Sequence, residues 1–460
     1  MAETNGGQQR ALWLSTVAFT VCFAVWTIFA IIGVQIKKDL ALNDTEFGLL
    51  VGTPILTGSL IRLVLGVWTD QYGGRVVYVG VMLAAALATF LLTFADSYPT
   101  FLLAALGVGI AGGSFAVGIA YVSRWFPVER QGTALGIFGA GNVGAAVTKF
   151  LAPVVMVAFG WEMVANLWAI GLVVMAVVFW FGTEDDPELK KRRAEGRKPE
   201  TMSAMLAPLK KLQVWRFSLY YFFVFGGFVA LALWLPRYYV GAYGLPITTA
   251  GMLAAAYSIP GSVFRAVGGW LSDKVGARAV MYWTFGVSIL CTFLLSYPTT
   301  RYVVEGIEEP IEFTLAMGVV PFTVLTFVLG FFMSLGKAAV YKHIPVYYPD
   351  NVGSVGGLVG MIGGLGGFVL PIAFGMLADL TGVWTSCFML LFVLVSGAML
   401  WMHLAVRRME RSAHPELGEL PQLPEMHGLG VPAGGMPHTR PRSPHSRAPA
   451  TLYPGAMPAE

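Results

Sequence analysis

The sequence predicts an all-α polytopic membrane protein with about twelve transmembrane helices in two six-helix halves. Its 460 residues are 56% hydrophobic and only 12% charged, which lies outside the range of soluble domains. Apolar runs long enough to cross a hydrocarbon layer of roughly 30 Å recur along the chain. The pattern GxxxDxxG occurs twice, at 66–73 and at 269–276, each time at the end of the second run of its half.

The spans follow from a hydropathy window of about 19 residues. The first run is too long for a signal-peptide core and has no small-residue cleavage site after it, so we expect it to be retained as a span. The predicted spans are 11–36, 46–69, 76–95, 99–123, 132–158 and 162–182 in the first half, and 215–241, 248–271, 278–298, 313–339, 351–378 and 383–405 in the second.

Two polar segments complete the domain organisation, which places the halves at 1–182 and 215–411. Residues 183–214 carry three acidic residues at 184–186 and then a basic cluster, so they are predicted to form a cytoplasmic linker. Residues 412–460 are rich in Pro, Gly, His and Ser and have almost no aliphatic run. Such a composition cannot bury a core, so this tail is predicted to be disordered.

The distribution of basic residues predicts the orientation in the bilayer. Lys and Arg of the short loops gather on one side, together with the central linker, and this predicts that both termini are cytoplasmic. The net charge of +4 is modest and reflects these loops, so it indicates a lipid bilayer as partner and not a nucleic acid.

Two arginines lie deep inside predicted spans. Arg62 and Arg265 each precede the Asp of the repeated pattern by eight residues, or about 12 Å of helix, which places them near the midplane. An arginine there costs about 2.5–3.5 kcal/mol on insertion scales. No Asp or Glu lies in the central part of any predicted span, so the simplest counter-ion is an anionic substrate held by the guanidinium forks. The alternative is that both arginines pair with backbone carbonyls or reach outward to the interface.

Two glycine-rich stretches occupy the fifth span of each half, at 136–153 and 357–375. Small residues at this density let helices approach closely and suit a narrow site for a small solute. For most of these glycines taken singly, ordinary helix packing is the alternative explanation.

These motifs carry a family resemblance that covers about Leu12 to Arg407. GVWTDQYGGR at 66–75 and GWLSDKVGAR at 269–278 resemble the cytoplasmic loop signature of the major facilitator superfamily. The paired glycine stretches resemble the nitrate signatures of its nitrate/nitrite porter branch. The resemblance implies a facilitator fold in the plasma membrane, the inner membrane of a bacterium, that binds nitrate between its halves and exposes it to either side in turn. In this scheme the loop residues act in gating; they are Asp70, Arg75, Asp273 and Arg278.

Carried over residue by residue, the resemblance makes Arg62 and Arg265 the nitrate-binding arginines. It also implies a signature amide from the fifth span, a tyrosine and a phenylalanine from the seventh, and an aromatic ring from the fourth that sandwiches the ion. Tyr220 is a one-residue competitor for the tyrosine. The implied residues are Asn142, Tyr221, Phe225 and Phe115. As chemistry, the amide and phenol supply neutral donors, and the two rings exclude water and form a flat slot.

Lysines in or beside the spans distinguish this chain from the exchangers of that branch. Lys149, Lys337, Lys342 and His343 stand where those exchangers have neutral residues, and GAAVTKF resembles the members that couple nitrate uptake to protons. Burial disfavours the charged form of an amine, so Lys149 and Lys337 are candidates for proton coupling. For Lys342, a position near a helix end is the preferred explanation. We therefore expect nitrate/proton symport into the cytoplasm, with nitrate/nitrite antiport as the alternative.

Other functional classes have less support. GVGIAGG at 107–113 fits a dinucleotide motif, but no strand precedes it, and no catalytic motif is present, so an enzyme is not expected. Cys22, Cys291 and Cys387 lie in apolar segments and are predicted to be packing residues, and neither a metal nor a cofactor is expected. An anion channel and a nitrate sensor are further alternatives, and a monomer is expected.

Overall fold

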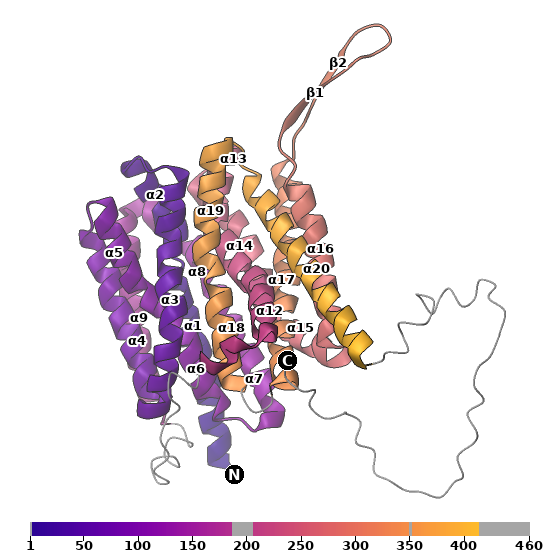
Figure 1. Cartoon of the computed structure of the whole chain (residues 1–460). Coiled ribbons are helices and arrows are strands. Elements are labelled where there is room, and N and C mark those ends of the chain that lie inside the picture. The colour runs from indigo at the N-terminus through magenta and orange to yellow at the C-terminus, as the bar shows by residue number, and fades with distance from the viewer. Residues whose placement is uncertain (1, 186–205, 349–351, 414–460) are drawn as a thin grey trace, which may run out of the picture. The chain divides into compact units, whose positions relative to one another are not determined.

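The computed structural model describes residues 2–185, 206–348 and 352–413, and in these it is almost entirely helical (Figure 1). The first half begins with α1 and α2, which follow one another through a short break and form the first span. Its elements are α1 (Ala2–Trp26), α2 (Phe29–Asp39), α3 (Asp44–Tyr72), α4 (Gly74–Leu91), η1 (Leu92–Phe94), α5 (Tyr98–Val108), η2 (Gly109–Gly113), α6 (Ser114–Ser123), α7 (Val128–Gly139), η3 (Ala140–Val143), α8 (Gly144–Phe159) and α9 (Trp161–Gly182).

The second half repeats this order with one insertion, a pair of strands. Its elements are η4 (Ala207–Lys210), α12 (Leu212–Tyr221), η5 (Phe222–Gly227), α13 (Phe228–Tyr243), α14 (Ile247–Val263), α15 (Arg265–Val275), α16 (Ala277–Leu295), β1 (Thr300–Val304), β2 (Ile311–Leu315), α17 (Val319–Tyr347), α18 (Val352–Gly364), α19 (Gly366–Thr381) and α20 (Ser386–Ala413).

Apart from the start of the tenth, the predicted spans agree with these elements. Within the described residues, eleven helices are long and apolar enough to cross a membrane, and the bent pair α14–α15 makes a twelfth. The repeated pattern also has a physical basis, because its last glycine makes the tight turn after the second span of each half. Gly73 and Gly276 have φ of 94° and 90°, a region that residues with a side chain rarely adopt.

The hairpin of β1 and β2 was not predicted. The tenth span was expected to begin at residue 313, but β2 runs over Ile311–Leu315 and α17 begins only at Val319. Both strands are rich in β-branched and aromatic residues, and Arg301 and Glu312 form an ion pair across them. A hydropathy window of about 19 residues averages over this short strand and the helix that follows it, so the predicted span begins too early. The end of the helix bundle that carries the hairpin is called the hairpin side below, and the opposite end the linker side.

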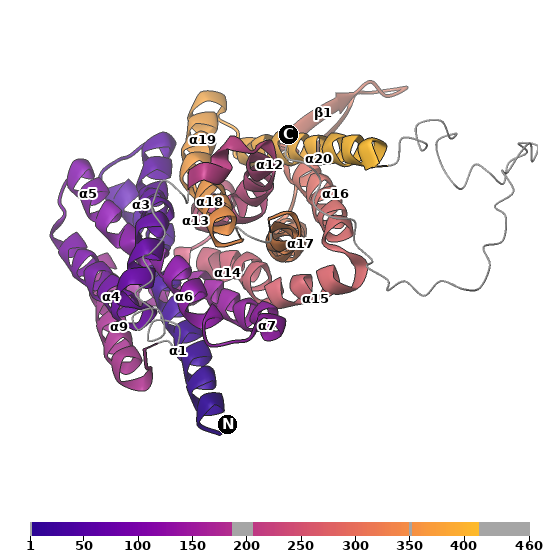
Figure 2. The same cartoon turned by 60° about the horizontal axis from the view of Figure 1, so that its bottom comes forward.

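The second span of each half packs against the fifth span of the other half. α3 lies along α18 and α19, while α14 and α15 lie along α8 and α7; Figure 1 and Figure 2 both place α19 beside α3. The approach is close, since a Cβ added at Gly52 of α3 would lie 2.9 Å from the carbonyl oxygen of Phe368 of α19. Glycine in these spans therefore brings the two halves together at two related places.

Polar contacts join the halves on the hairpin side. The carboxylate of Asp379, from α19, accepts hydrogen bonds from the N–H groups of Asp44 and Thr45 at 3.1 and 2.8 Å. These are the first residues of α3, where free N–H groups and the helix dipole favour a negative charge. Asp44 also pairs with Lys37 at 3.2 Å and with Arg237 of α13 at 3.3 Å. In this conformation the two halves are thus held together on that side.

The described residues up to Met399 form one compact unit, and the described part beyond it, residues 400–413, is the last part of α20. Cys22, Cys291 and Cys387 are buried and unbridged, as expected of packing residues. Most of the predicted linker and the tail lie outside the described residues, so their predictions stand untested.

Candidate functional site

Breaks in the spans carry most of the predicted substrate-binding residues. Glycine clusters interrupt the regular helix as 3-10 turns in η2 and η3 and as a π-helical turn in η5, and α14 and α15 meet at another break. Irregular backbone inside a membrane protein is tolerated where it lines a site. Phe115 is the second residue after η2, Asn142 lies in η3, Tyr221 directly precedes η5, Phe225 lies in η5, and Arg265 opens α15. Arg62 lies within the continuous helix α3.

The two arginines meet around one aromatic ring. Arg62 and Arg265 are only 4% and 7% exposed, so neither guanidinium reaches bulk water. Their Cζ atoms lie 5.2 and 5.5 Å from the ring centre of Phe115. Among the side chains that the structure describes, every buried charged residue is basic: Arg62, Lys149, Arg265 and Lys337. The sequence prediction of paired cations without a buried acid is met in this part of the chain.

Each arginine lies against the glycine stretch of the opposite half. A Cβ on Gly139 of α7 would lie 3.1 Å from Cδ of Arg265, and a Cβ on Gly364 of α18 would lie 3.4 Å from Nη1 of Arg62. Nη1 of Arg62 also donates a hydrogen bond to the carbonyl oxygen of Gly360 at 3.0 Å. The alternative of pairing with a backbone carbonyl is therefore realised for one nitrogen of Arg62. The glycines leave room for guanidinium groups between the halves.

Several buried donors and acceptors have no hydrogen-bond partner within the described residues. They are Nε and Nη2 of Arg62, Nη1 of Arg265, both amide atoms of Asn142 and the hydroxyl of Tyr221. Leaving one such group unsatisfied costs about 1–3 kcal/mol, and more for a charged group. Unpaired polar atoms gathered from both halves suit a small polar solute with several acceptor oxygens.

The aromatic residues form a row beside these donors. Tyr221 and Phe225 stack with ring centres 5.0 Å apart and planes 13° apart. Phe225 and Phe115 are also nearly parallel, at 20°, but their centres are 6.4 Å apart. The competitor Tyr220 packs instead against Phe285. The ring on the arginine side is therefore that of Tyr221.

Three further residues contact the site and were not predicted. The ring of Tyr341, from α17, lies 5.6 Å from Cζ of Arg265 and packs edge-on against Tyr221. Trp26 of α1 lies 5.6 Å from Cζ of Arg62. The buried hydroxyl of Ser59, one turn before Arg62, would lie 2.6 Å from a Cβ on Gly364. Tyr341 lies four residues after Lys337, and Ser59 lies three residues before Arg62. Residues at these spacings share a helix face, so the spacing could have identified both as neighbours of the predicted site residues.

Both predicted proton-coupling lysines are fully buried. Nζ of Lys149, on α8, donates to the Ser258 hydroxyl of α14 at 2.8 Å and to the Ala145 carbonyl at 3.3 Å. Nζ of Lys337, on α17, donates to the Gly261 carbonyl of α14 at 2.7 Å. Lys149 thus joins the two halves, whereas Lys337 contacts its own half.

The predicted gating residues lie at the linker side. Arg75 donates to the carbonyl of Trp180 and lies over its ring at 4.3 Å. Asp273 forms an exposed ion pair with Lys342, and such pairs contribute little stability. Arg278 is the second residue of α16. Asp70 lies in the last turns of α3, and its side chain is outside the described set.

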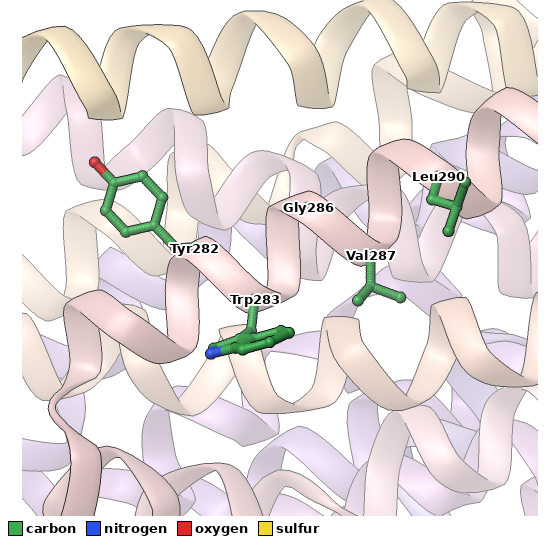
Figure 3. Close-up of a pocket in the computed structure, with 5 residues that line it drawn as sticks. All are labelled: Tyr282, Trp283, Gly286, Val287 and Leu290. Atoms are coloured by element: carbon green, nitrogen blue, oxygen red, sulfur yellow. The ribbon is translucent and has the colours of Figure 1, made fainter. Parts of the chain in front are cut away.

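A shallow surface cavity of about 260 Å³ lies elsewhere, on α16 (Figure 3). Its lining comes from one helix and includes Trp283 and Leu290, which are 66% and 57% exposed. A depression lined by one exposed apolar helix face suits lipid chains and not a polar solute. It plays no part in the site between the arginines.

Comparison with known proteins agrees with this architecture. The model of the Major Facilitator Superfamily matches residues 14–305. A "Probable nitrate/nitrite antiporter NarK1" of Thermus thermophilus is 47% identical over 415 residues, which cover 87% of this chain and 92% of the relative. The chain belongs to the NarK-type nitrate/nitrite transporter family of the Major Facilitator Superfamily. The expectation of a multi-pass transporter and not an enzyme is thereby confirmed.

Other members of the NarK-type family and two solved structures are also similar. A "Probable nitrate/nitrite transporter NarK2" of Mycobacterium tuberculosis is 32% identical, over 81% of this chain and 90% of the relative. A "Nitrite extrusion protein" of Bacillus subtilis is 29% identical, over 86% and 95%. A bacterial homologue of the lysosomal transporter Spinster has a TM-score of 0.68 at 16% identity, over 87% and 97%. A mutant form of the nucleoside transporter NupG has a TM-score of 0.65 at 13% identity, over 85% and 99%. At these identities the two structures support the fold alone.

Proposed function

We propose that this NarK-type transporter carries nitrate across the bacterial inner membrane by alternating access, with the ion bound between Arg62 and Arg265. The observation that carries the proposal is the set of unpaired guanidinium nitrogens contributed by both halves around Phe115. Two like charges at low dielectric repel, so an anion between them lowers the energy of both. Relatives named for nitrate or nitrite transport support nitrate as that anion.

The shape of nitrate matches the donors and the rings. Nitrate is planar, with three equivalent oxygens that accept hydrogen bonds in its plane. Arg62 offers Nε and Nη2, Arg265 offers Nη1, and Asn142 offers its amide. The ring centres of Phe115 and Phe225 are 6.4 Å apart, near the roughly 7 Å spanned by two carbon contact distances. A flat ion between such rings would keep its oxygens directed at the arginines.

Alternating access follows from the division of the site between the halves. Each arginine packs on the glycine stretch of the opposite half, so a rotation of one half against the other separates donors that now converge. The contacts of Asp379 with the start of α3 hold the hairpin side closed in this conformation. We infer that the hairpin side is extracellular and that both termini are cytoplasmic, as the basic loops predict.

Proton coupling is the proposed energy source, with inward nitrate/proton symport as the direction. Lys149 is the better placed of the two candidates because its amine bonds to Ser258 across the halves, so rocking changes its surroundings. An amine that is buried in one state and hydrated in the other can bind and release a proton. Lys337 is the second candidate, and its amine bonds within its own half, to the carbonyl of Gly261.

Nitrate/nitrite antiport is the second candidate function. It is favoured by the printed name of the Thermus thermophilus relative, an antiporter, and the same site would serve it. In this case a departing nitrite, and not a proton, would reset the charge of the arginines.

Transport by purified protein in liposomes separates these candidates. Nitrate entry should be accelerated by an alkaline-inside pH gradient in vesicles that contain no nitrite. If internal nitrite alone accelerates nitrate entry and the gradient has no effect, symport is wrong and antiport holds. If neither condition gives nitrate entry above that of protein-free vesicles, the assignment of nitrate fails.

A further inference from the structure

The span that carries Arg265 is broken, whereas the corresponding span that carries Arg62 is continuous. α14 ends at Val263 and α15 begins at Arg265, with a bend of 41° between them. Pro260 supplies no N–H to the helix, and Phe264 departs from helical geometry at φ −74° and ψ 5°. A binding residue that directly follows a break depends on whatever fixes the break in one geometry.

Lys337 supplies a hydrogen bond at this break. The carbonyl of Gly261 lies in the last turn of α14, directly before the break. Here it accepts from Nζ of Lys337 at 2.7 Å, and the side chain of Lys337 is fully buried. The last carbonyls of a helix need such donors, and the helix dipole favours a cation beside them.

Aromatic rings hold the amine in place. Nζ of Lys337 lies 3.1 Å from the ring centre of Phe228 and 5.8 Å from that of Phe225. The face of an aromatic ring attracts a cation. A neutral amine also keeps N–H groups, so the bond to Gly261 survives in either protonation state. The contact is thus suited to a constant structural task.

The same face of α17 also contacts the guanidinium group itself. Tyr341 lies one turn after Lys337; its ring is 5.6 Å from Cζ of Arg265, and its hydroxyl donates to the Gly356 carbonyl at 3.1 Å. A Cβ on Gly268 of α15 would lie 2.6 Å from Cα of the α17 residue Leu335, so the two helices are in direct backbone contact. α17 therefore holds the segment of Arg265 at its backbone and at its charged end.

We propose that Lys337 is a positioning residue: its amine donates to the Gly261 carbonyl beside the break and so fixes Arg265 in the orientation that binds the anion. The inference rests on the proposed nitrate site and sharpens it, because it gives the two buried lysines different roles. The partners of Lys337 belong to its own half and move with it, so rocking leaves this contact intact. Lys149, in contrast, bonds across the halves to Ser258.

The test compares Lys337→Met and Lys337→Arg with Lys274→Met. Lys274 is a matched control because it lies over an aromatic ring, Trp270, at 4.3 Å on the same helix as Arg265, but is exposed. Nitrate binding is measured by calorimetry, nitrate entry is measured in liposomes with and without a pH gradient, and amide hydrogen exchange is measured over residues 261–268.

The positioning role predicts at least tenfold weaker nitrate binding in Lys337→Met, partial recovery in Lys337→Arg and wild-type affinity in Lys274→Met. The residual transport of Lys337→Met should still respond to the pH gradient, and exchange over 261–268 should rise in this variant alone. Unchanged affinity with loss of the pH response would overturn the inference and make Lys337 a proton carrier. Unchanged hydrogen exchange over 261–268 would also overturn it, and this readout needs no nitrate. Failure of the wild type to bind nitrate would instead count against the proposed function.

Discussion

Arg62→Lys tests whether the shape of the guanidinium, and not only its charge, binds the anion. Arg62 uses Nη1 on the carbonyl of Gly360 and leaves Nε and Nη2 without a protein partner. A lysine keeps the charge but has one nitrogen, so it cannot hold the carbonyl and also present a two-pronged donor to nitrate.

The magnitude follows from the bonds lost. One hydrogen bond to a charged group is worth about 1.5–3 kcal/mol, which corresponds to a rise in Kd of about 10- to 150-fold. The measurement is calorimetric titration of nitrate into purified protein, with thermal unfolding measured in parallel to confirm that the variant folds. Arg301→Lys is the control, because that side chain is 67% exposed in the hairpin and should leave Kd unchanged. An Arg62→Lys variant that folds and binds within twofold of wild type would refute the two-pronged geometry.

Three further predictions concern coupling, gating and packing. Lys149→Met should remove the response of nitrate entry to a pH gradient while nitrate counterflow persists; an unaltered pH response would exclude it as proton carrier. Asp379→Ala removes an exposed carboxylate from the first N–H groups of α3, a contact worth about 0.5–2 kcal/mol. Opening of the hairpin side should then become more frequent, so thiol labelling of a cysteine introduced on that side should rise a fewfold. Unchanged labelling would show that Asp379 does not stabilise the closed state. Gly364→Ala puts a methyl 2.6 Å from the Ser59 hydroxyl and should weaken nitrate binding, whereas Gly357→Ala, with no atom within 4 Å of the added carbon, should not; equal affinities would contradict this packing.

The spans and the two central arginines could be predicted from sequence because hydrophobicity and depth are local properties. A charged residue in the middle of an apolar run, at a fixed helical distance from a repeated turn, can be recognised from the sequence alone. The turn glycines Gly73 and Gly276 are equally local, since their positive φ depends only on the backbone. These features need no knowledge of which helices are neighbours.

The remaining features depend on how the halves dock. Nothing in the sequence around Asp379 says that it meets the start of α3, because a charged residue near a span end looks like any interfacial residue. The bond from Lys337 to Gly261 likewise requires a broken α14 beside α17, and sequence alone indicated only a buried amine. The hairpin could not be told from the tenth span by hydropathy, because its second strand is largely apolar and lies directly before α17.

A structure determined with bound nitrate tests the central claim most directly. The account predicts nitrate within hydrogen-bonding distance of the free nitrogens of Arg62 and Arg265 and between the rings of Phe115 and Phe225. A variant with both arginines changed to glutamine should lose this ion. Nitrate bound elsewhere, with the two guanidinium groups paired only to protein atoms, would contradict the account.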